Sequence, residues 1–250
     1  MITEQYFIGI DNTDGPGCEG TGALVRALAA AIDEAGWGQS MGVTRHELLQ
    51  SDKITYTNEN FTYAMGLQTD RDPMDLEDYL VDYVREHASR EADPGVAILS
   101  RHSDMDHILS FGRRSQQEVM RHDWALQFSQ EGNVALRGLG AKRLGMTGAL
   151  AAAGLRAGGQ DGRFIDWPGL RDLPTRLTAG QIRERTGIEQ IYDQENEPLD
   201  RDDMVETLDW LRPRVEIGKP VIRTQRSTEP GVGRLWVVVD RRPTSEPAGD

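Results

Sequence analysis

The chain has 250 residues, with 41 acidic and 28 basic side chains and a formal net charge of −13. This length allows one large domain or two small ones, each with a hydrophobic core. The acidity argues against a protein whose main task is to grip a nucleic-acid backbone, because that binding depends on clustered Lys and Arg. A small cationic substrate fits the charge better.

Cysteine usage indicates the compartment. Cys18 is the only cysteine, so the sequence excludes an intramolecular disulfide and a cysteine-based zinc site. The first residues lack a basic segment followed by an apolar one, and no apolar run approaches membrane-spanning length. We therefore expect a cytoplasmic protein that does not enter a membrane.

The opening segment predicts a strand, an acidic turn and a helix. Residues 5–10 are mostly β-branched or aromatic, and this strand stops at Asp11. From Leu24 the apolar residues recur at helical spacing, with Thr21 as the expected N-cap and Gly36 just beyond the end. Two carboxylates, Asp11 and Asp14, thus lie beside a helix N-terminus.

A helix N-terminus attracts anions such as phosphate, whereas carboxylates repel them. A divalent cation between them removes the conflict, because Mg²⁺ commonly takes one or two carboxylates together with phosphate oxygens and waters. On this interpretation Asp11 and Asp14 bind metal, and the Thr21 hydroxyl lies close to the phosphate. The structural alternative is an Asx-turn at Asp14 and a simple cap at Thr21.

The rest of the first half predicts a mixed α/β domain. Asn58, Glu59 and Asn60 should form a hairpin turn. The expected strands are 41–44, 54–56, 61–67 and 96–99, with a helix over 76–87.

A capping box at Ser115 and Glu118 predicts a helix that runs to about Ser129. We place a domain boundary between residues 113 and 114. The second half should then form an α+β domain up to residue 240, followed by a disordered tail over 241–250. Its expected strands are 134–136, 163–165, 190–192, 214–217, 221–223 and 235–239, with helices over 146–153 and from Thr178.

The loop from Arg137 to Gly148 is the second candidate site. Its glycines let a backbone approach a ligand closely, and its cations precede a helix N-terminus, as in an anion cradle. The loop is not a P-loop, because the Gly-Lys-Ser/Thr ending is absent. The alternative is a solvated turn between a strand and a helix.

A third candidate is the run from His102 to His107, which offers four potential metal ligands within six residues. This pattern would suit a metal-dependent hydrolase. The same residues also fit a helix start, with Ser103 or Asp104 as the cap and acidic side chains in the first turn.

Several of these motifs together resemble one known family. The segment GIDNTD, followed by Gly20, Thr21 and Gly22, is similar to the N-terminal domain of TiaS, the archaeal tRNA 2-agmatinylcytidine synthetase. That enzyme uses ATP to activate a cytidine carbonyl oxygen for attack by agmatine. The similarity continues through Ile54-Thr55-Tyr56, Pro94-Gly95-Val96, Gly148-Ala149-Leu150-Ala151-Ala152 and Lys219-Pro220-Val221-Ile222.

The resemblance implies a kinase-like α/β domain over residues 1–113 and a ferredoxin-like α+β domain over residues 114–240. It implies that Asp11 and Asp14 serve Mg-ATP and that Thr21 can accept phosphate. The helix that starts near Gly148 gives the preceding basic loop weight as a wall of the site. We accordingly expect nucleotide contacts from Asn12, Thr13, Gly20, Gly22, Lys142 and Arg143.

Two departures from the family pattern matter. Asn12 replaces the second aspartate of the motif, which removes one charge and one metal ligand. The chain also ends where the family's RNA-binding OB-fold and zinc ribbon should begin. We therefore do not expect direct tRNA binding without a partner that presents the tRNA. A homo-oligomer is compatible with the sequence.

The leading hypothesis is an ATP- and Mg²⁺-dependent phosphotransferase or ligase that activates an oxygen of a small-molecule or nucleoside acceptor, with an amine such as agmatine as the attacking group. Two alternatives stand beside it. Asn12 favours a nucleotide-binding regulatory protein without catalysis, and the run from His102 to His107 favours a metal-dependent hydrolase.

Overall fold

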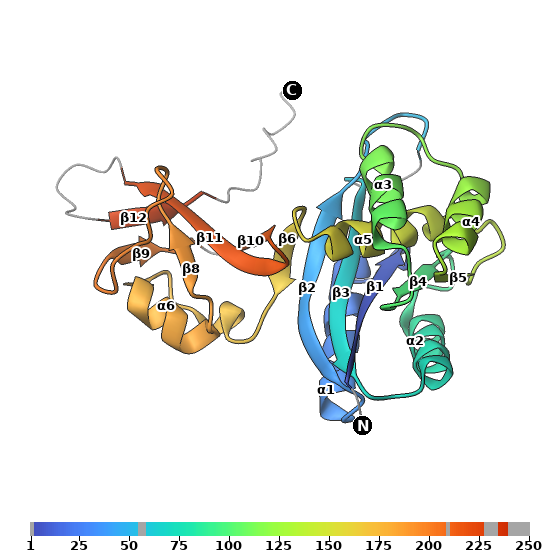
Figure 1. Cartoon of the computed structure of the whole chain (residues 1–250), viewed down its shortest axis with the longest axis horizontal. Helices are drawn as coiled ribbons and strands as arrows, with labels where there is room; N and C mark the ends of the chain where they lie inside the picture. The colour runs from blue at the N-terminus through green and yellow to red at the C-terminus, as the bar shows by residue number, and fades with distance from the viewer. Residues whose placement is uncertain (1–2, 55–58, 209–210, 228–234, 240–250) are drawn as a thin grey trace.

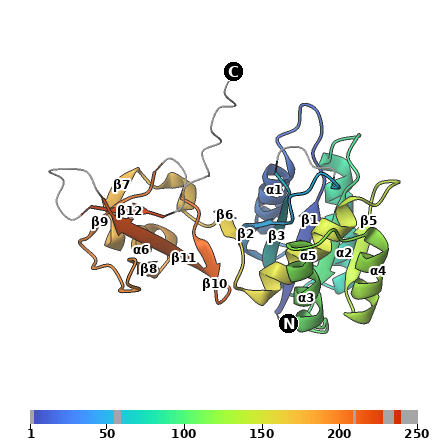
Figure 2. The ribbon, with the colours of Figure 1, turned by 90° about the horizontal axis from the view of Figure 1, so that it is seen from above.

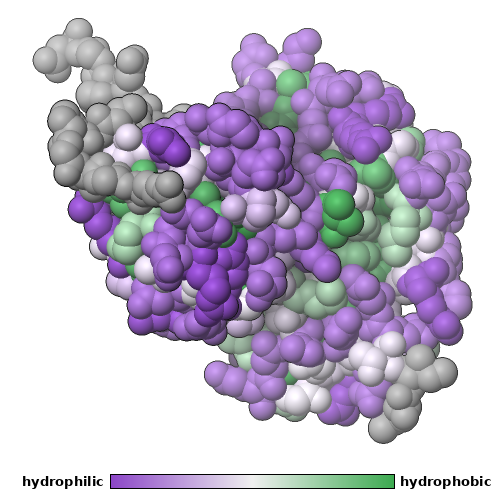
Figure 3. All heavy atoms as spheres, turned by 60° about the vertical axis from the view of Figure 1, so that its left-hand side comes forward, coloured by the Kyte–Doolittle hydropathy of each residue, from purple (hydrophilic) through white to green (hydrophobic). Residues whose placement is uncertain are grey.

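The computed structural model of this chain describes residues 3–54, 59–208, 211–227 and 235–239. They form two lobes that lie side by side (Figure 1). The first lobe contains residues 3–158, and the second contains the described residues from 163 to 239. Hydrophilic residues cover most of the face in Figure 3, and hydrophobic ones gather in patches near its middle.

The first lobe is built on an antiparallel sheet with the strand order β5-β4-β1-β3-β2. In its centre, Ile8 of β1 lies opposite Met65 of β3 on one side and Ile98 of β4 on the other. The strands are β1 (Glu4–Asp11), β2 (Gln39–Glu47), β3 (Phe61–Thr69), β4 (Gly95–Leu99) and β5 (Ala135–Gly138). The helices are α1 (Thr21–Glu34), α2 (Pro73–His87), α3 (Met105–Ser115), α4 (His122–Glu131) and α5 (Gly145–Gly158).

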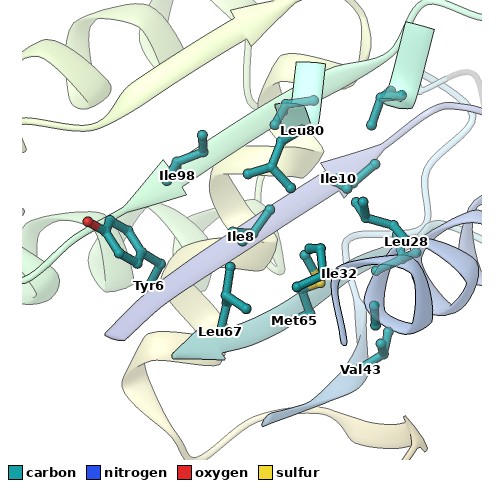
Figure 4. Packing of buried hydrophobic residues seen from close by; sticks show 14 of the residues in the cluster. Tyr6, Ile8, Ile10, Leu28, Ile32, Val43, Met65, Leu67, Leu80 and Ile98 are labelled. Atoms are coloured by element: carbon teal, nitrogen blue, oxygen red, sulfur yellow. The ribbon is translucent and has the colours of Figure 1, made fainter. Parts of the chain in front are cut away.

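Helices cover both faces of this sheet, which makes three layers (Figure 2). Because side chains alternate along a strand, Tyr6, Ile8 and Ile10 of β1 face one side, where they pack against α1 and α2 (Figure 4). Phe7 faces the other side and packs in a second cluster with α3, α4 and α5. The sequence pattern of β1 is thus that of a strand buried on both faces.

Helix α5 lies unusually close to β1 because both contribute small residues. A Cβ atom added at Gly9 would lie 1.9 Å from the carbonyl oxygen of Ala149 in α5. The inner part of α5 is rich in alanine and glycine, and these residues are buried. This close approach carries the N-terminal end of α5 to the point where β1 ends.

The second lobe has its own core, centred on Ile182, Ile191 and Ile222. Helix α6 begins after Thr178, as predicted, and the two residues Thr178 and Gln181 form a capping box: the Thr178 hydroxyl accepts from the Gln181 N–H, and the Gln181 side chain accepts from the Thr178 N–H. The elements are β6 (Arg163–Asp166), the 3₁₀ turn η1 (Leu170–Asp172), β7 (Arg176–Thr178), α6 (Ala179–Thr186), β8 (Gln190–Tyr192), β9 (Met204–Glu206), β10 (Arg214–Glu216), β11 (Lys219–Arg226) and β12 (Leu235–Val238).

The two lobes share one continuous sheet, because β6 pairs with β2 of the first lobe and with β10 of the second. At the seam between β6 and β10, one residue pair is in register, Arg163 opposite Arg214. The backbone hydrogen bonds around this pair run from Phe164 N to Pro213 O at 2.8 Å and from Val215 N to Gly162 O at 3.1 Å.

The mixed α/β class is confirmed, as are most of the expected elements. The single helix expected from Ser115 to about Ser129 is wrong, because α3 ends at Ser115 and α4 begins at His122. Ser115 is buried, and its hydroxyl donates to the Phe111 carbonyl one turn earlier in α3. Glu118 is ion-paired with Arg114 and so does not close a capping box.

Among the smaller expectations, the N-cap of α1 is wrong, and others fall wholly or partly outside the described residues. Gly20 with φ of 90°, not Thr21, occupies the N-cap position of α1. Ile54 lies outside the strands, while the rest of the strand expected over 54–56 and part of the turn at 58–60 lie outside the described residues. The tail expected over 241–250 also lies outside them.

The division expected between residues 113 and 114 falls within the last turn of α3. Beyond that point, α4, β5 and α5 still belong to the layers built on the first-lobe sheet. Among the described residues, no helix is both long enough and apolar enough to cross a membrane.

We predict that Gly9→Ala lowers the free energy of unfolding by about 3 kcal/mol, because the added methyl group must push the α5 backbone away from β1. Urea titration measures the change. Gly36→Ala is the control: it meets no atom within 4 Å, and its φ of 66° costs only about 1 kcal/mol. Equal losses in the two variants would contradict the close-packing account.

Candidate functional site

A cavity of about 900 Å³ opens where β1 ends and α1 begins. Its walls come from the acidic turn after β1, the ends of β2 and β3, the connection between α3 and α4, and the first turn of α5. Residues from distant parts of the sequence therefore meet here. Among the predicted site residues, those that line the cavity are Asp11, Asn12, Asp14, Gly20 and Thr21.

Asp11 is the last residue of β1, and its carboxylate lies against the first turn of α5. A Cβ atom added at Gly148 would lie 2.0 Å from Asp11 Oδ2. The Thr62 hydroxyl of β3 lies beside this contact and donates to the Gly148 carbonyl at 2.8 Å. Only a glycine at position 148 leaves room for the Asp11 carboxylate.

The position of Asp11 changes its acidity. Burial raises the pKa of the Asp11 carboxyl to about 8, and the nearby charge of Asp14 acts in the same direction. A hydrogen bond from the Asn12 N–H and the nearby Thr62 side chain oppose the shift. A carboxyl group with this pKa holds a proton at neutral pH unless a cation takes its place.

Thr21 points into the acidic turn. Its Oγ1 accepts from Thr13 N at 3.2 Å and donates to Asp14 Oδ1 at 3.4 Å. The Thr13 hydroxyl also donates to Thr21 Oγ1, at 3.1 Å. This network fixes one hydroxyl and one carboxylate at the same corner of the cavity, although Thr21 and Asp14 are seven residues apart.

Asn12 has a different role from its two acidic neighbours. It adopts a left-handed conformation with φ of 57°, and its side-chain amide donates to the Asp93 carbonyl at 3.1 Å. Asp93 in turn accepts from Lys142 N at 2.6 Å and from Leu144 N at 2.9 Å. Asn12 thereby ties the acidic turn to the glycine-rich loop before α5.

Two helices begin at this cavity. Thr21 is the first residue of α1, and Thr147 and Gly148 in the first turn of α5 also line the space. The first N–H groups of each helix and the positive ends of both helix dipoles favour negative charge nearby. We call the part of the cavity formed by Asp11, Asp14 and the Thr21 hydroxyl the acidic corner, and it lies between these two helix ends.

The cations that line the cavity are Arg45, Lys53 and Arg121, and sequence reasoning missed all three. The Arg45 guanidinium lies 4.0 Å above the Phe61 ring, an arrangement that holds it in place at the wall. Arg45 gave little sequence signal, because β2 also contains other polar residues such as Gln39, His46 and Glu47. Its position depends on the pairing of β2 with β3, which spacing does not reveal.

Arg45 also begins a row of arginines across the sheet. Tyr63 of β3 pairs with Arg45 of β2, Arg45 pairs with Arg163 of β6, and Arg163 pairs with Arg214 of β10. Directly paired residues share one face of a sheet, so the three arginines form a row that starts at the cavity. Like charges opposite one another oppose folding, and the Glu216 carboxylate of β10 offsets part of this repulsion because it lies near Arg163 and Arg214.

The basic loop from Arg137 to Gly148 contributes fewer cations to the cavity than expected. Lys142 and Arg143 are not among the residues that line the cavity, and the loop contributes Leu144 instead. Arg137 forms an ion pair with Glu77 of α2. The nucleotide contacts expected from Lys142 and Arg143 stay predictions.

The run from His102 to His107 is a helix start. Asp104 caps α3 by accepting from the His107 N–H at 3.0 Å, and the His107 ring stacks on Phe128 at 4.6 Å. Within the part of the chain that the structure describes, no group of three His, Cys, Asp or Glu side chains could hold a metal. The hydrolase hypothesis therefore has no metal centre there.

No protein-family model and no curated protein matches this sequence. Solved structures do match. Apo TiaS (tRNAIle2 agmatidine synthetase) is 22% identical with a TM-score of 0.51, and the match covers 60% of this chain and 35% of that one. A TiaS–tRNA(Ile2)–ATP complex is 25% identical with a TM-score of 0.53, over 60% and 36% of the two chains.

A TiaS–tRNA(Ile2)–AMPCPP–agmatine complex is 20% identical with a TM-score of 0.52, over 71% of this chain and 43% of the other. The resemblance to TiaS is thereby confirmed at the level of the fold. The chain spans about two fifths or less of the length of these solved structures.

We predict that Asp11→Asn stabilises the ligand-free protein at pH 8. The folded-state pKa of Asp11 is raised, so the carboxyl penalises the fold increasingly as pH rises from about 4 to about 8. Asparagine removes this penalty, and even one pKa unit corresponds to about 1.4 kcal/mol. Thermal melts of both proteins at about pH 5 and pH 8 measure the difference.

The gain should be larger at pH 8 than at pH 5. Asp106→Asn, an exposed carboxylate in the first turn of α3, is the control and should show no such trend. A gain that is the same at both pH values would refute the raised pKa.

Proposed function

We propose that this chain is a TiaS-like enzyme that uses Mg-ATP to phosphorylate an oxygen of its acceptor and so prepares that position for attack by an amine. The observation that carries the proposal is the acidic corner, where Asp11, Asp14 and the Thr21 hydroxyl meet between the N-termini of two helices. The TiaS-like fold supports the assignment, since structures with this fold contain ATP or AMPCPP.

The residues at this corner fit a magnesium ion. Carboxylates and hydroxyls are hard oxygen donors, and Mg²⁺ usually takes one or two carboxylates and keeps several waters. A bound cation would neutralise the charge of the triphosphate and hold Asp11 in its ionised form, against the effect of burial. We assign Asp11 and Asp14 as the residues that hold it.

The remaining residues would orient the nucleotide. Backbone N–H groups around Gly20 and Gly22 and in the first turn of α5 favour phosphate oxygens, and Thr21 offers an oxygen that can accept a phosphoryl group. Arg45 lines the same cavity, where a fixed guanidinium can stabilise the charge that develops on the transferred group.

The amine and the acceptor follow from the charges around the cavity. Besides Asp11 and Asp14, which we assign to the metal, and Glu118, which pairs with Arg114, the described lining of the cavity includes Glu19 and Glu59, and these two carboxylates suit a cationic amine. The row Arg45, Arg163 and Arg214 suits an acceptor that carries phosphate. This row, and the tRNA in the solved TiaS complexes, count against our expectation that direct tRNA binding requires a partner.

A nucleotide-binding protein without catalysis is the second candidate. It is favoured by Asn12, whose side chain holds Asp93 and leaves the motif with two carboxylates instead of three. Isothermal titration with Mg-ATP, followed by chromatography for released ADP or AMP, separates the candidates. Binding without release would support the regulator.

We predict that Asp11→Asn and Asp14→Asn each weaken Mg-ATP binding at least about tenfold and abolish ATP turnover, because each removes a metal ligand. Titration calorimetry with and without Mg²⁺ measures the effect. Asp106→Asn is the matched control, since it makes the same change on an exposed helix. Wild-type turnover in Asp11→Asn would reject the assignment.

We also predict that Arg45→Gln lowers the rate of ATP turnover by about a hundredfold while Mg-ATP affinity changes little, because the guanidinium acts on charge that develops during transfer. Steady-state kinetics separate kcat from KM. Arg85→Gln, which alters an exposed arginine on α2, should behave as wild type. A change confined to KM would give Arg45 a role in binding alone.

A further inference from the structure

A series of hydrogen-bonded polar side chains leads from β2 to the connection between α3 and α4, outside the site described above. His46 is fully buried on β2, and its Nδ1 is 2.7 Å from Asp161 Oδ1. Its Nε2 is 2.9 Å from the Thr44 hydroxyl, which also lies 3.2 Å from the Ala64 carbonyl. Desolvation lowers the pKa of His46, so the ring is neutral at pH 7 and donates to Asp161 through Nδ1.

The other oxygen of Asp161 reaches a different element. Gln116 Nε2 donates to Asp161 Oδ2 at 3.0 Å and to the Glu47 carbonyl at 3.0 Å. Gln116 is the first residue after α3, while Asp161 lies in the short connection from α5 to β6. One carboxylate therefore joins β2, the end of α3 and the entry to the second lobe.

The segment held by Gln116 is a wall of the cavity. Residues 116–121 connect α3 to α4, and Glu118, Val119, Met120 and Arg121 from this connection line the cavity. These four side chains sit on a segment without regular secondary structure. Its first N–H groups, those of Gln117 and Glu118, donate to the Arg114 carbonyl in the last turn of α3. The hydrogen bonds of Gln116 anchor the start of that segment.

We propose that Gln116 and Asp161 are positioning residues, which hold the 116–121 connection against the cavity and so couple ligand binding there to the junction between the lobes. The choice of Mg-ATP as the probe rests on the proposed function. The coupling itself rests on hydrogen bonds that join three elements through one carboxylate.

Among the described residues, few charged groups lie near this series of polar side chains. Thr44 and His46 come from β2, Asp161 and Arg163 flank the start of β6, and Arg156 approaches from α5. His46, Gln116 and Arg163 lower the pKa of Asp161 against the effect of burial, so it is ionised at pH 7 and accepts from both neighbours. A negative charge placed at position 116 would meet that carboxylate directly.

The test compares Gln116→Leu, Gln116→Glu and the matched control Gln117→Leu, an exposed neighbour in the same connection. Hydrogen–deuterium exchange measures the amides of residues 117–121, and titration calorimetry measures the Kd for Mg-ATP. We expect Gln116→Leu to speed exchange of these amides and weaken Mg-ATP binding, each about tenfold, because a bond to a charged group is lost. Gln117→Leu should match wild type.

Gln116→Glu should give a pH dependence of amide exchange and Mg-ATP affinity that a loss of packing alone would not produce. At about pH 7.5 the new carboxylate repels Asp161, whereas near pH 5 it takes up a proton and can donate to Asp161. Relative to wild type at the same pH, exchange and affinity should recover at the lower pH in this variant and stay impaired in Gln116→Leu.

Wild-type exchange and affinity in Gln116→Leu would overturn the proposal, as would a Gln116→Glu defect that persists at the lower pH. If the wild-type protein fails to bind Mg-ATP, the proposed function is rejected. The exchange comparison then still decides whether Gln116 holds the connection, because it needs no ligand.

Discussion

The close contact between α5 and β1 determines the geometry of this molecule. Gly9 lets the helix backbone lie against the strand, and Gly148 lets the Asp11 carboxylate fit beside the first turn of that helix. Because the interior of a protein is densely packed, a methyl group at either glycine would separate the two elements. The same contact therefore places a helix N-terminus, a buried acid and the mouth of the cavity together.

This arrangement lowers the stability of the fold in order to keep acidic groups at the cavity. A carboxyl group whose pKa is raised to about 8 weakens the fold at neutral pH, and a second acid lies three residues away. Such groups persist in proteins where the charge is used, since folding alone would favour a neutral side chain. The arginines paired across β2, β6 and β10 place like charges opposite one another, a repulsion that Glu216 offsets in part.

The local features of this chain were readable from sequence because they depend on near neighbours. The strand before Asp11, the capping box at Thr178 and Gln181, and the small-residue helix each follow from spacing and residue type. Arg45 and Arg121 could not be foreseen, because their meeting at one cavity depends on strand register and on the path between α3 and α4. The break after Ser115 depends on tertiary burial of that residue, which overrode a capping pattern.

The seam between β6 and β10 is a point where the sheet can twist, because few backbone hydrogen bonds join these two strands. The first-lobe strands are joined by long ladders, with seven residue pairs between β1 and β3, whereas β6 and β10 are in register at one pair. A twist between β6, which is also paired with β2, and the rest of the second lobe would strain few backbone hydrogen bonds if it were concentrated at Arg163 and Arg214. Arg163 lies two residues beyond Asp161. Such a twist would therefore also displace the Asp161 carboxylate, which accepts from Gln116 and so anchors the cavity wall.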